Sequence, residues 1–524
     1  MNKININCII LSSYHLSSFV DLKNVVLSSS SFKNLFEQFE SNPIEINQSQ
    51  RKYFINLKTL NLYNSTQNEF LDDTNISKRI YWYKISYSTY LKYKSNNTIY
   101  KNIEYTQEDR NKYGYIIPIE CSYLGNHYFK YFSSNQIIIP DNINELGRYC
   151  FYQCHKSNEI QLPSSISKLS ERCFDNCDMY NFNIPNNIKE LGIYSFSNCS
   201  NLSQISIPSS ISKLSKGCFN SCGFNEFIIP NHIKQIDSAC FYGCTNLSKI
   251  YIPSSINTLP DNCFGECGFN EFIIPNHIKE IGNSCFSGCT KLSKIQIPST
   301  ISILPKYCFK KNHFKKISIP NHITKLGKEC FALCSLLTSI HLSNKLLSLP
   351  KRCFKECGFL SFKIPSNIKN IGNDCFSFCY NLTNIKFSSS ISKLPSCCFQ
   401  ECGFKKLKLS NSIKEIGNQC FLNCFNLSKI EIPSTITKLP QSCFENCKKL
   451  IKIEIHSNIK EIDEYCFSNC LNLTSIIIPN SISKIYSNSF YKTSFQNSIE
   501  FNSDDIKKIN IFDKNRFDYK ELRE

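Results

Sequence analysis

The sequence predicts an α/β repeat solenoid, with short parallel strands on one face and short helical or 3-10 turns on the other. The first observation is a series of seventeen phenylalanines at steps of 22 or 23 residues. A fixed period of this size indicates one supersecondary unit copied many times. The second observation is that most of these phenylalanines lie in a Cys-Phe-x-x-Cys motif. The series comprises Phe129, Phe151, Phe174, Phe196, Phe219, Phe241, Phe264, Phe286, Phe309, Phe331, Phe354, Phe376, Phe399, Phe421, Phe444, Phe467 and Phe490.

Each repeat unit divides into three parts. Residues 250–253 alternate inward and outward side chains, which indicates a short strand, and the proline then ends strand pairing. Two inward aliphatic residues follow, as at Ile278 and Ile281. The Cys-Phe-x-x-Cys motif then places two thiols four residues apart, which predicts one face of a helical turn. Because Gly and Pro alternate after the second aliphatic, as at Gly282 and Pro305, the structural period is about 45 residues, or two coils.

The chain has 31 cysteines, of which 28 belong to the repeat. Stacked coils bring equivalent residues to about 5 Å, the distance between strands, so two columns of thiols are expected. We favour reduced, buried thiols that fill the core as small apolar groups. Disulfides between successive coils and a zinc site are the alternatives, although the spacing is not a Cys-x2-Cys knuckle. The predicted structural core is represented by Cys240, Phe241, Cys244, Cys285, Phe286, Cys289, Cys375, Phe376 and Cys379.

The repeat resembles that of the BspA-like leucine-rich repeat family. Its unit has the form L-x-x-I-x-I-P-x-x-V-x-x-I-G-x-x-A-F-x-x-C, which residues 290–298 match in the first half and residues 278–289 in the second. Cys285 occupies the position where the family commonly has Ala. The resemblance implies a right-handed curved leucine-rich solenoid with its parallel strands on the concave face. It also implies binding rather than catalysis.

Three segments are predicted along the chain. Residues 1–113 lack the repeat and are expected to form a small, mainly helical cap, because a solenoid must cover its apolar end. Residues 114–501 form the solenoid, and residues 502–524 form a charged C-terminal tail. Residues 11–39 also resemble a divergent F-box, with Leu22, Val25 and Phe32 as its apolar positions, although the opening Leu-Pro is absent.

The strands present two unusual groups of outward residues. We consider an apolar step and a basic run to be candidate partner-binding residues, because exposed apolar patches and like-charged stripes mark interaction sites. A solubilising polar surface with incidental clustering is the alternative. These candidates are Ile228, Tyr251 and Ile273 for the apolar step, and His341, Lys363, Lys386 and Lys408 for the basic run.

The function predicted is a non-catalytic scaffold that binds a protein partner on its concave face. The net charge of +18 favours an acidic partner, whereas no nucleic-acid module is visible. We expect no catalytic, cofactor or metal site, since no such residues converge. No apolar stretch has the length of a membrane span or a secretory signal, which predicts a cytoplasmic protein. An F-box-like substrate receptor of a ubiquitin ligase and a BspA-like cell-surface adhesin or antigen are the alternatives, and the oligomeric state is left open.

Overall fold

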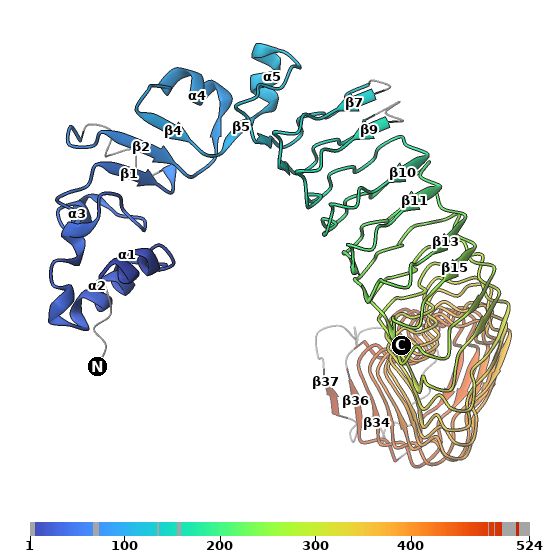
Figure 1. Ribbon diagram of the computed structural model, residues 1–524. Helices are drawn as coiled ribbons and strands as arrows, with labels where there is room; N and C mark the ends of the chain where they lie inside the picture. Colours follow the sequence, from blue (N-terminus) through green and yellow to red (C-terminus); the bar gives the residue numbers. More distant parts are fainter. Residues whose placement is uncertain are drawn as a thin grey trace. The chain divides into compact units, whose positions relative to one another are not determined.

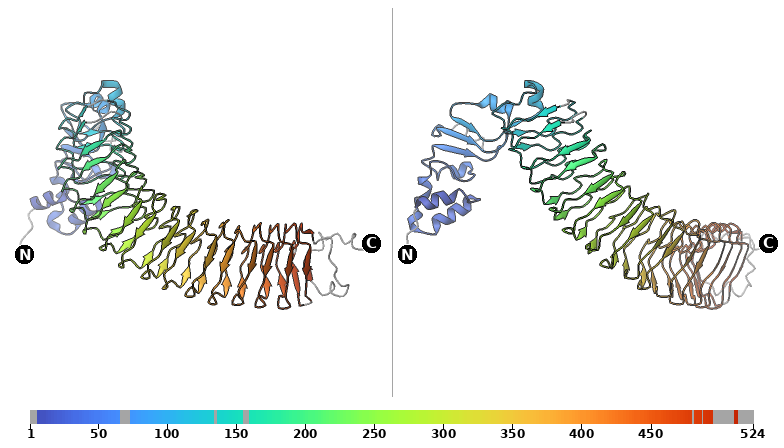
Figure 2. Two further views of the ribbon diagram at one scale, coloured as in Figure 1. Left: turned by 90° about the vertical axis from the view of Figure 1, so that its right-hand side faces the viewer. Right: turned by 45° about the vertical axis from the view of Figure 1, so that its right-hand side comes forward.

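The computed structural model describes residues 6–65, 73–133, 136–154, 159–479, 481–486, 488–494 and 510–512. They form two compact units, residues 1–199 (unit 1) and residues 200–524 (unit 2), which we describe separately. Both units consist of coils that stack through parallel strands (Figures 1 and 2). The fold class predicted from the sequence is therefore confirmed.

Unit 1 begins with short helices that pack on one apolar cluster. Leu22, Phe32 and Leu35 from these helices lie in one core with Phe54 and Leu60 of the first coils. The helices that contribute to this core are α1 (Ile6–Ser13), α2 (Phe19–Leu27), η1 (Ser30–Phe32) and η2 (Leu35–Gln38). Unit 1 also contains α3 (Gln48–Arg51), α4 (Tyr87–Tyr93) and α5 (Gln107–Tyr113). The structure thus has a small helical region at the N-terminal end.

The parallel ladders of unit 1 begin before the repeat motif does. Strands β1, β2 and β4 pair in parallel at offsets near twenty residues, and β3, β5, β6 and β8 form a second parallel sheet. The sequence did not predict these coils, because they lack the Cys-Phe-x-x-Cys motif. The strands of unit 1 are β1 (Thr59–Leu62), β2 (Lys78–Tyr81), β3 (Ile85–Ser86), β4 (Thr98–Tyr100), β5 (Ile103–Tyr105), β6 (Tyr123–Leu124), β7 (Gln136–Ile138), β8 (Glu145–Leu146), β9 (Glu159–Gln161) and β10 (Asn181–Asn183).

Each coil of unit 2 contributes a three-residue strand to a surface that we call the long-strand face. Figure 2 shows these strands as a row of parallel arrows. They are β11 (Gln204–Ser206), β13 (Glu226–Ile228), β15 (Lys249–Tyr251), β17 (Glu271–Ile273), β19 (Lys294–Gln296), β21 (Lys316–Ser318), β23 (Ser339–His341), β25 (Ser361–Lys363), β27 (Asn384–Lys386), β29 (Lys406–Lys408), β31 (Lys429–Glu431), β33 (Lys452–Glu454) and β35 (Ser475–Ile477).

A second strand in each coil lies on what we call the short-strand face. These strands are β12 (Lys213–Leu214), β14 (Gln235–Ile236), β16 (Thr258–Leu259), β18 (Glu280–Ile281), β20 (Ile303–Leu304), β22 (Lys325–Leu326), β24 (Ser348–Leu349), β26 (Asn370–Ile371), β28 (Lys393–Leu394), β30 (Glu415–Ile416), β32 (Lys438–Leu439), β34 (Glu461–Ile462), β36 (Lys484–Tyr486) and β37 (Asn510–Phe512). Apart from β37, the predicted C-terminal tail lies outside the described residues.

On both faces most strands pair only in twos, so every second junction between coils lacks a strand pair. This alternation explains the two-coil period. On the short-strand face β16 pairs with β18 and β20 with β22, but β18 does not pair with β20. The N–H of Gly282 donates to the carbonyl of Leu259 at 2.6 Å. The equivalent residue of the next coil is Pro305, which has no N–H to donate. Proline therefore interrupts this ladder at every second coil between Pro260 and Pro440.

In four coils of the other type, a glycine lies against the backbone of the preceding coil just before the long strand. A Cβ on Gly268 would lie 2.1 Å from the carbonyl oxygen of Thr245 in the preceding coil. Gly223, Gly358 and Gly403 have the same close contact with the coil before them. These glycines precede β17, β13, β25 and β29, each of which starts a new segment of the ladder. Because these glycines have no side chain, their backbone can lie close to the backbone of the preceding coil.

The Cys-Phe-x-x-Cys motif is not helical, which corrects the helical turn that we predicted there. Ser284 and Gly288, the residues before each cysteine of one motif, have φ of 55° and 73°, in the left-handed region. The N–H groups of Ser284, Phe286 and Gly288 donate to carbonyls of the next coil at 2.7–3.1 Å. The motif therefore forms a third ladder between coils, whereas a helix would use these groups internally. Beyond α5, the described residues contain no α-helix.

The phenylalanines and thiols of the motif fill the interior. Phe286 is fully buried, with ring centroids 5.8 Å from Phe264 and 6.1 Å from Phe309. Cys285 and Cys289 beside it are also fully buried, as are Cys240, Phe241, Cys244, Cys375, Phe376 and Cys379. The thiol of Cys289 donates to the carbonyl of Phe264 in the preceding coil at 3.1 Å, and ten second-position cysteines of unit 2 make this bond.

Candidate binding surface

The long-strand face presents two columns of exposed side chains. In each three-residue strand the middle residue points into the core and the outer two point outward, as in β25, where Phe362 is buried between Ser361 and Lys363. Packing leaves the outward positions free to vary, so their chemistry distinguishes one coil from the next. All seven candidate partner-binding residues lie in these columns.

The apolar step occupies the N-terminal part of this face in unit 2. The side chains of Ile228, Tyr251 and Ile273 are 70%, 46% and 65% exposed. Ile228 and Tyr251 are register partners on β13 and β15. The Nζ of Lys249 lies 4.9 Å from the centroid of the Tyr251 ring and makes a cation–π contact with one face of that ring. The structure thus exposes three large apolar groups on successive coils.

The middle of the long-strand face is basic and has no acidic residue. The six strands from β19 to β29 are all described, and their twelve outward positions include no Asp or Glu. We call the Lys and His side chains on the strands from β21 to β29 the basic strip. It contains the predicted basic run and two lysines of the neighbouring column: Lys316, His341, Lys363, Lys386, Lys406 and Lys408.

Like charges face each other within the basic strip. Lys363 and Lys386 are register partners on adjacent strands, and Lys406 is the partner of Lys429. Among the described residues, no carboxylate forms an ion pair with Lys316, Lys363, Lys386 or Lys406. Like charges directly opposite each other destabilise a sheet. The folded protein therefore maintains an unfavourable arrangement on this face.

The short-strand face is different, because Lys213, Lys393 and Lys438 on its strands form ion pairs with carboxylates. Among the described residues, Lys325 on β22 has no such ion pair, but its register partner is Ile303 and not a lysine. Lys393 is the register partner of Glu415, and their charged groups lie 2.5 Å apart. Lys438 likewise pairs with Glu461 at 3.1 Å. Since both faces belong to the same coils, the repeat itself does not require unbalanced lysines. The opposed lysines Lys363 and Lys386 have no counterpart among the register partners of the described short strands of unit 2.

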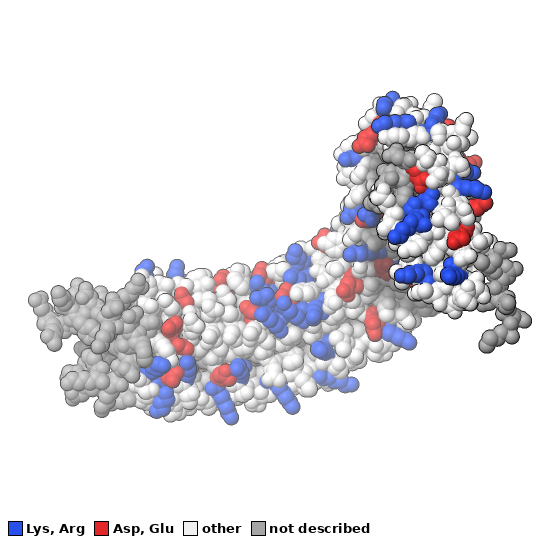
Figure 3. All heavy atoms as spheres, turned by 90° about the vertical axis from the view of Figure 1, so that its left-hand side faces the viewer, with Lys and Arg blue, Asp and Glu red and all other residues white. Residues whose placement is uncertain are grey.

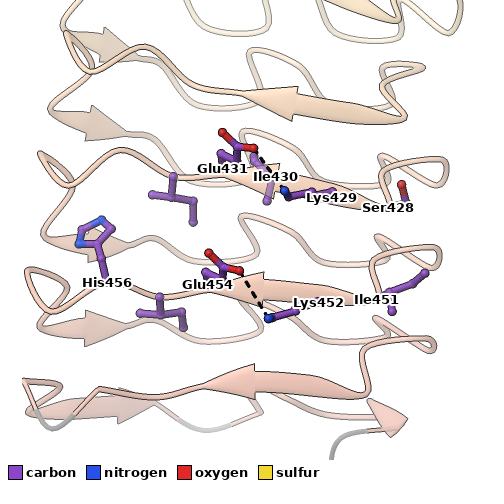
Figure 4. Close-up of a pocket in the computed structure, with 10 residues that line it drawn as sticks. Ser428, Lys429, Ile430, Glu431, Ile451, Lys452, Glu454 and His456 are labelled. Carbon is purple, nitrogen blue, oxygen red and sulfur yellow. Dashed lines mark ion pairs between the residues drawn. The ribbon is translucent and has the colours of Figure 1, made fainter.

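The basic strip ends at a hollow in the C-terminal part of the long-strand face. The hollow has a volume of about 770 Å³ and lies over β31 and β33 (Figure 4). Lys429 pairs with Glu431 at 3.3 Å and Lys452 with Glu454 at 3.5 Å, each within its own strand. Glu431 also pairs with Lys408 at 3.2 Å. These carboxylates neutralise Lys408 at the end of the basic strip and the lysines on β31 and β33.

A further cluster of charges, which sequence reasoning missed, surrounds a buried carboxylate. Lys310, Lys328 and Arg352, from three successive coils, lie 2.7, 3.6 and 3.8 Å from Glu329. Burial acts to raise the pKa of Glu329, but these cations outweigh it and hold the pKa below its usual value. On the face shown in Figure 3, Lys and Arg gather most densely near the middle of the long stack. The only sequence signal was the density of basic residues near 306–355.

The cysteines form neither disulfides nor a metal site within the described residues. None of the 31 cysteines, all within the described residues, forms a disulfide, and burial raises the pKa of Cys244, Cys289 and Cys379 to about 12. Burial also raises the pKa of Cys240, Cys285 and Cys375 above the usual value. Within the described ranges, no three His, Cys, Asp or Glu residues are placed to hold a metal ion. None of the helices in the described part of the chain could cross a membrane.

The stacked parallel coils with inward aliphatic residues define a leucine-rich repeat protein. The model of the BspA type leucine rich repeat region matches six times, over residues 122–245, 167–273, 212–334, 257–383, 302–427 and 392–522. The chain therefore belongs to the BspA type leucine-rich repeat family.

Solved structures of bacterial leucine-rich repeat proteins are similar over most of the chain. A protein from Bacteroides ovatus is 22% identical, with 71% of this chain and 80% of that chain covered and a TM-score of 0.39. A leucine rich cell surface protein from Faecalibacterium prausnitzii is 21% identical, with 76% and 85% covered and a TM-score of 0.30. No curated protein matches the sequence.

Proposed function

We propose that this protein is a non-catalytic scaffold that binds another protein on the long-strand face of unit 2. The observation that supports this most directly is the contrast between the two faces. Lys393 and Lys438 on the short-strand face lie opposite carboxylates, whereas Lys363 and Lys386 on the long-strand face lie opposite each other without one. A surface that served only solubility would gain nothing from this arrangement. A partner that supplied carboxylates would relieve it.

Affinity capture tests the proposal. The double variant Lys363→Glu/Lys386→Glu should lose the partner that the wild type captures. The matched control is Lys369→Glu/Lys414→Glu, which makes the same charge change at two exposed lysines beside the short strands β26 and β30. Equal capture of the partner by both double variants would show that the long-strand face is not the binding surface.

The N-terminal helices are proposed to cap the first coils rather than to recruit a ubiquitin-ligase adaptor. Leu22 and Phe32 are buried and Val25 packs against them, so the residues that an F-box would use for docking are already engaged. Capture of an adaptor that is lost on mutation of exposed residues of α2, such as Val20, would favour the substrate-receptor alternative.

The free thiols support a reducing, cytoplasmic setting. The alternative is a cell-surface adhesin or antigen, in line with the cell surface protein named above. Labelling intact cells with an impermeant thiol or amine reagent distinguishes the two locations. A labelled protein would establish the surface location.

A further inference from the structure

The chemistry of the long-strand face changes in a fixed order along the coils. The apolar step lies on β13, β15 and β17, neutral polar residues follow at Gln296 and Ser318, and the basic strip continues to β29. Beyond β29, Glu431 and Glu454 neutralise the neighbouring lysines. The column of Ile228, Tyr251 and Ile273 thus favours apolar groups, while Glu226, Lys249 and Glu271 form the other column of the same strands. The next part of the face favours carboxylates, and the last part favours neither.

We propose that the partner presents an extended, acidic peptide segment that crosses these strands, with its apolar residues at one end. The proposal rests on the proposed function and specifies the chemistry of its partner. Apolar side chains of the segment would contact Ile228, Tyr251 and Ile273. Its carboxylates would lie over Lys363 and Lys386. The acidic part would end near Glu431, whose negative charge disfavours a further carboxylate.

The dimensions of the face define the length of the segment. Nine strands, from β13 to β29, carry the apolar step and the basic strip, which gives eight steps between neighbouring coils. At about 4.8 Å for each step the distance is about 38 Å. An extended chain advances about 3.3 Å for each residue, so about 11 or 12 residues cover this distance.

The width of the face favours an extended chain over a helix. Each strand exposes only two outward residues, about 7 Å apart along the strand. A helix is about 10–12 Å wide, so it would extend past both columns. A nucleic acid would fit the basic strip, but its phosphates would gain nothing from Ile228 or Ile273 on the same face. The apolar step therefore selects a peptide.

Display selection with a library of random 16-residue peptides tests this inference on the full-length protein. We expect the enriched peptides to carry apolar residues at one end and Asp or Glu at the other. Lys363→Glu/Lys386→Glu should weaken an enriched peptide on the order of tenfold at low salt, and less at high salt because salt screens exposed charges. Selection on this variant should enrich Lys and Arg in place of Asp and Glu.

A separate variant tests the apolar end. Tyr251→Ser should remove the enrichment of apolar residues and leave that of acidic residues, whereas Lys369→Glu/Lys414→Glu should change neither. Enriched peptides without acidic residues, or with apolar residues at no preferred end, would overturn the inference. The inference would also be wrong if single-stranded DNA displaced the peptide equally well from wild type and from Tyr251→Ser.

The two proposals fail in different ways. If the captured cellular partner depends on Lys363 and Lys386 but binds through a folded or non-acidic surface, only the inference about the peptide segment is wrong. If capture of the cellular partner does not depend on either lysine, the proposed binding surface is itself wrong.

Discussion

Replacing Gly268 by alanine tests how the coils are spaced. The built Cβ lies 2.1 Å from the oxygen and 2.8 Å from the carbon of the Thr245 carbonyl. Both atoms belong to the backbone of the preceding coil, so no side chain can rotate away. The N–H of Gly268 donates to the carbonyl of Cys244 at 3.2 Å, and this bond would lengthen as the coils separate.

The expected cost follows from this geometry. Ordinary contact requires at least 3.4 Å, so the two backbones must separate by about 1 Å at this point. Overpacking of this kind costs about 1–3 kcal/mol, and the upper half of this range applies because the obstacle is backbone. The effect should remain local, because each coil contacts only its neighbours.

Urea unfolding followed by circular dichroism measures the loss of stability, and hydrogen exchange locates it. Protection should fall at the backbone N–H groups between Cys244 and Phe272. The control is Gly288→Asn, because the equivalent position of another coil is Asn423 with φ of 59°, and its cost should stay below about 1 kcal/mol. If the free energy of unfolding of Gly268→Ala lies within about 0.5 kcal/mol of the wild-type value, the close approach of the two backbones does not set the spacing.

Three further predictions concern a buried amide, the thiols and a buried carboxylate. Asn312 replaces a second-position cysteine, and its buried amide has no hydrogen-bond partner, so Asn312→Cys should raise the free energy of unfolding by about 1–3 kcal/mol. Alkylation of the native protein should label exposed Cys8 and partly exposed Cys397 first. Raising the pH to 9 should not make Cys289 reactive, because burial raises its pKa to about 12. Rapid labelling of all thiols would contradict their burial. Glu329→Gln should destabilise by about 1–3 kcal/mol at pH 7. Because the pKa of Glu329 is lowered in the folded state, the difference should shrink as pH falls below about 4, and a constant difference would refute the ion-pair explanation.

The periodic part of the fold was predictable from sequence because every coil repeats the same inward residues. The Phe series and the Gly and Pro alternation predicted stacked coils and a two-coil period. The backbone of the Cys-Phe-x-x-Cys motif was not predictable from spacing. Left-handed backbone conformations at positions such as Ser284 place the two thiols of a motif on the same side of the chain without a helix. The coils near β1 and β2 were missed because their packing uses other side chains.

The candidate surface was predictable only in part. Alternation along the strands identified Lys363 and Lys386 as outward residues. The sequence did not show that they oppose each other while Lys393 opposes Glu415, because register decides which residues pair. The Glu329 cluster depends on contacts between three coils, which a single repeat does not contain.

The imbalance on the long-strand face leads to a prediction about the free protein. Lys386→Glu replaces a like-charged pair by an opposite pair, so it should stabilise the protein by about 0.2–1 kcal/mol, although it should weaken binding. Lys393→Glu makes the same change where the register partner is Glu415, and it should destabilise by a similar amount. Urea unfolding of both variants at low salt makes the comparison, and the difference should decrease at high salt. If Lys386→Glu proves as harmful to folding as Lys393→Glu, then the lysines of the basic strip stabilise the coils. The argument that they are retained for a partner would then fail.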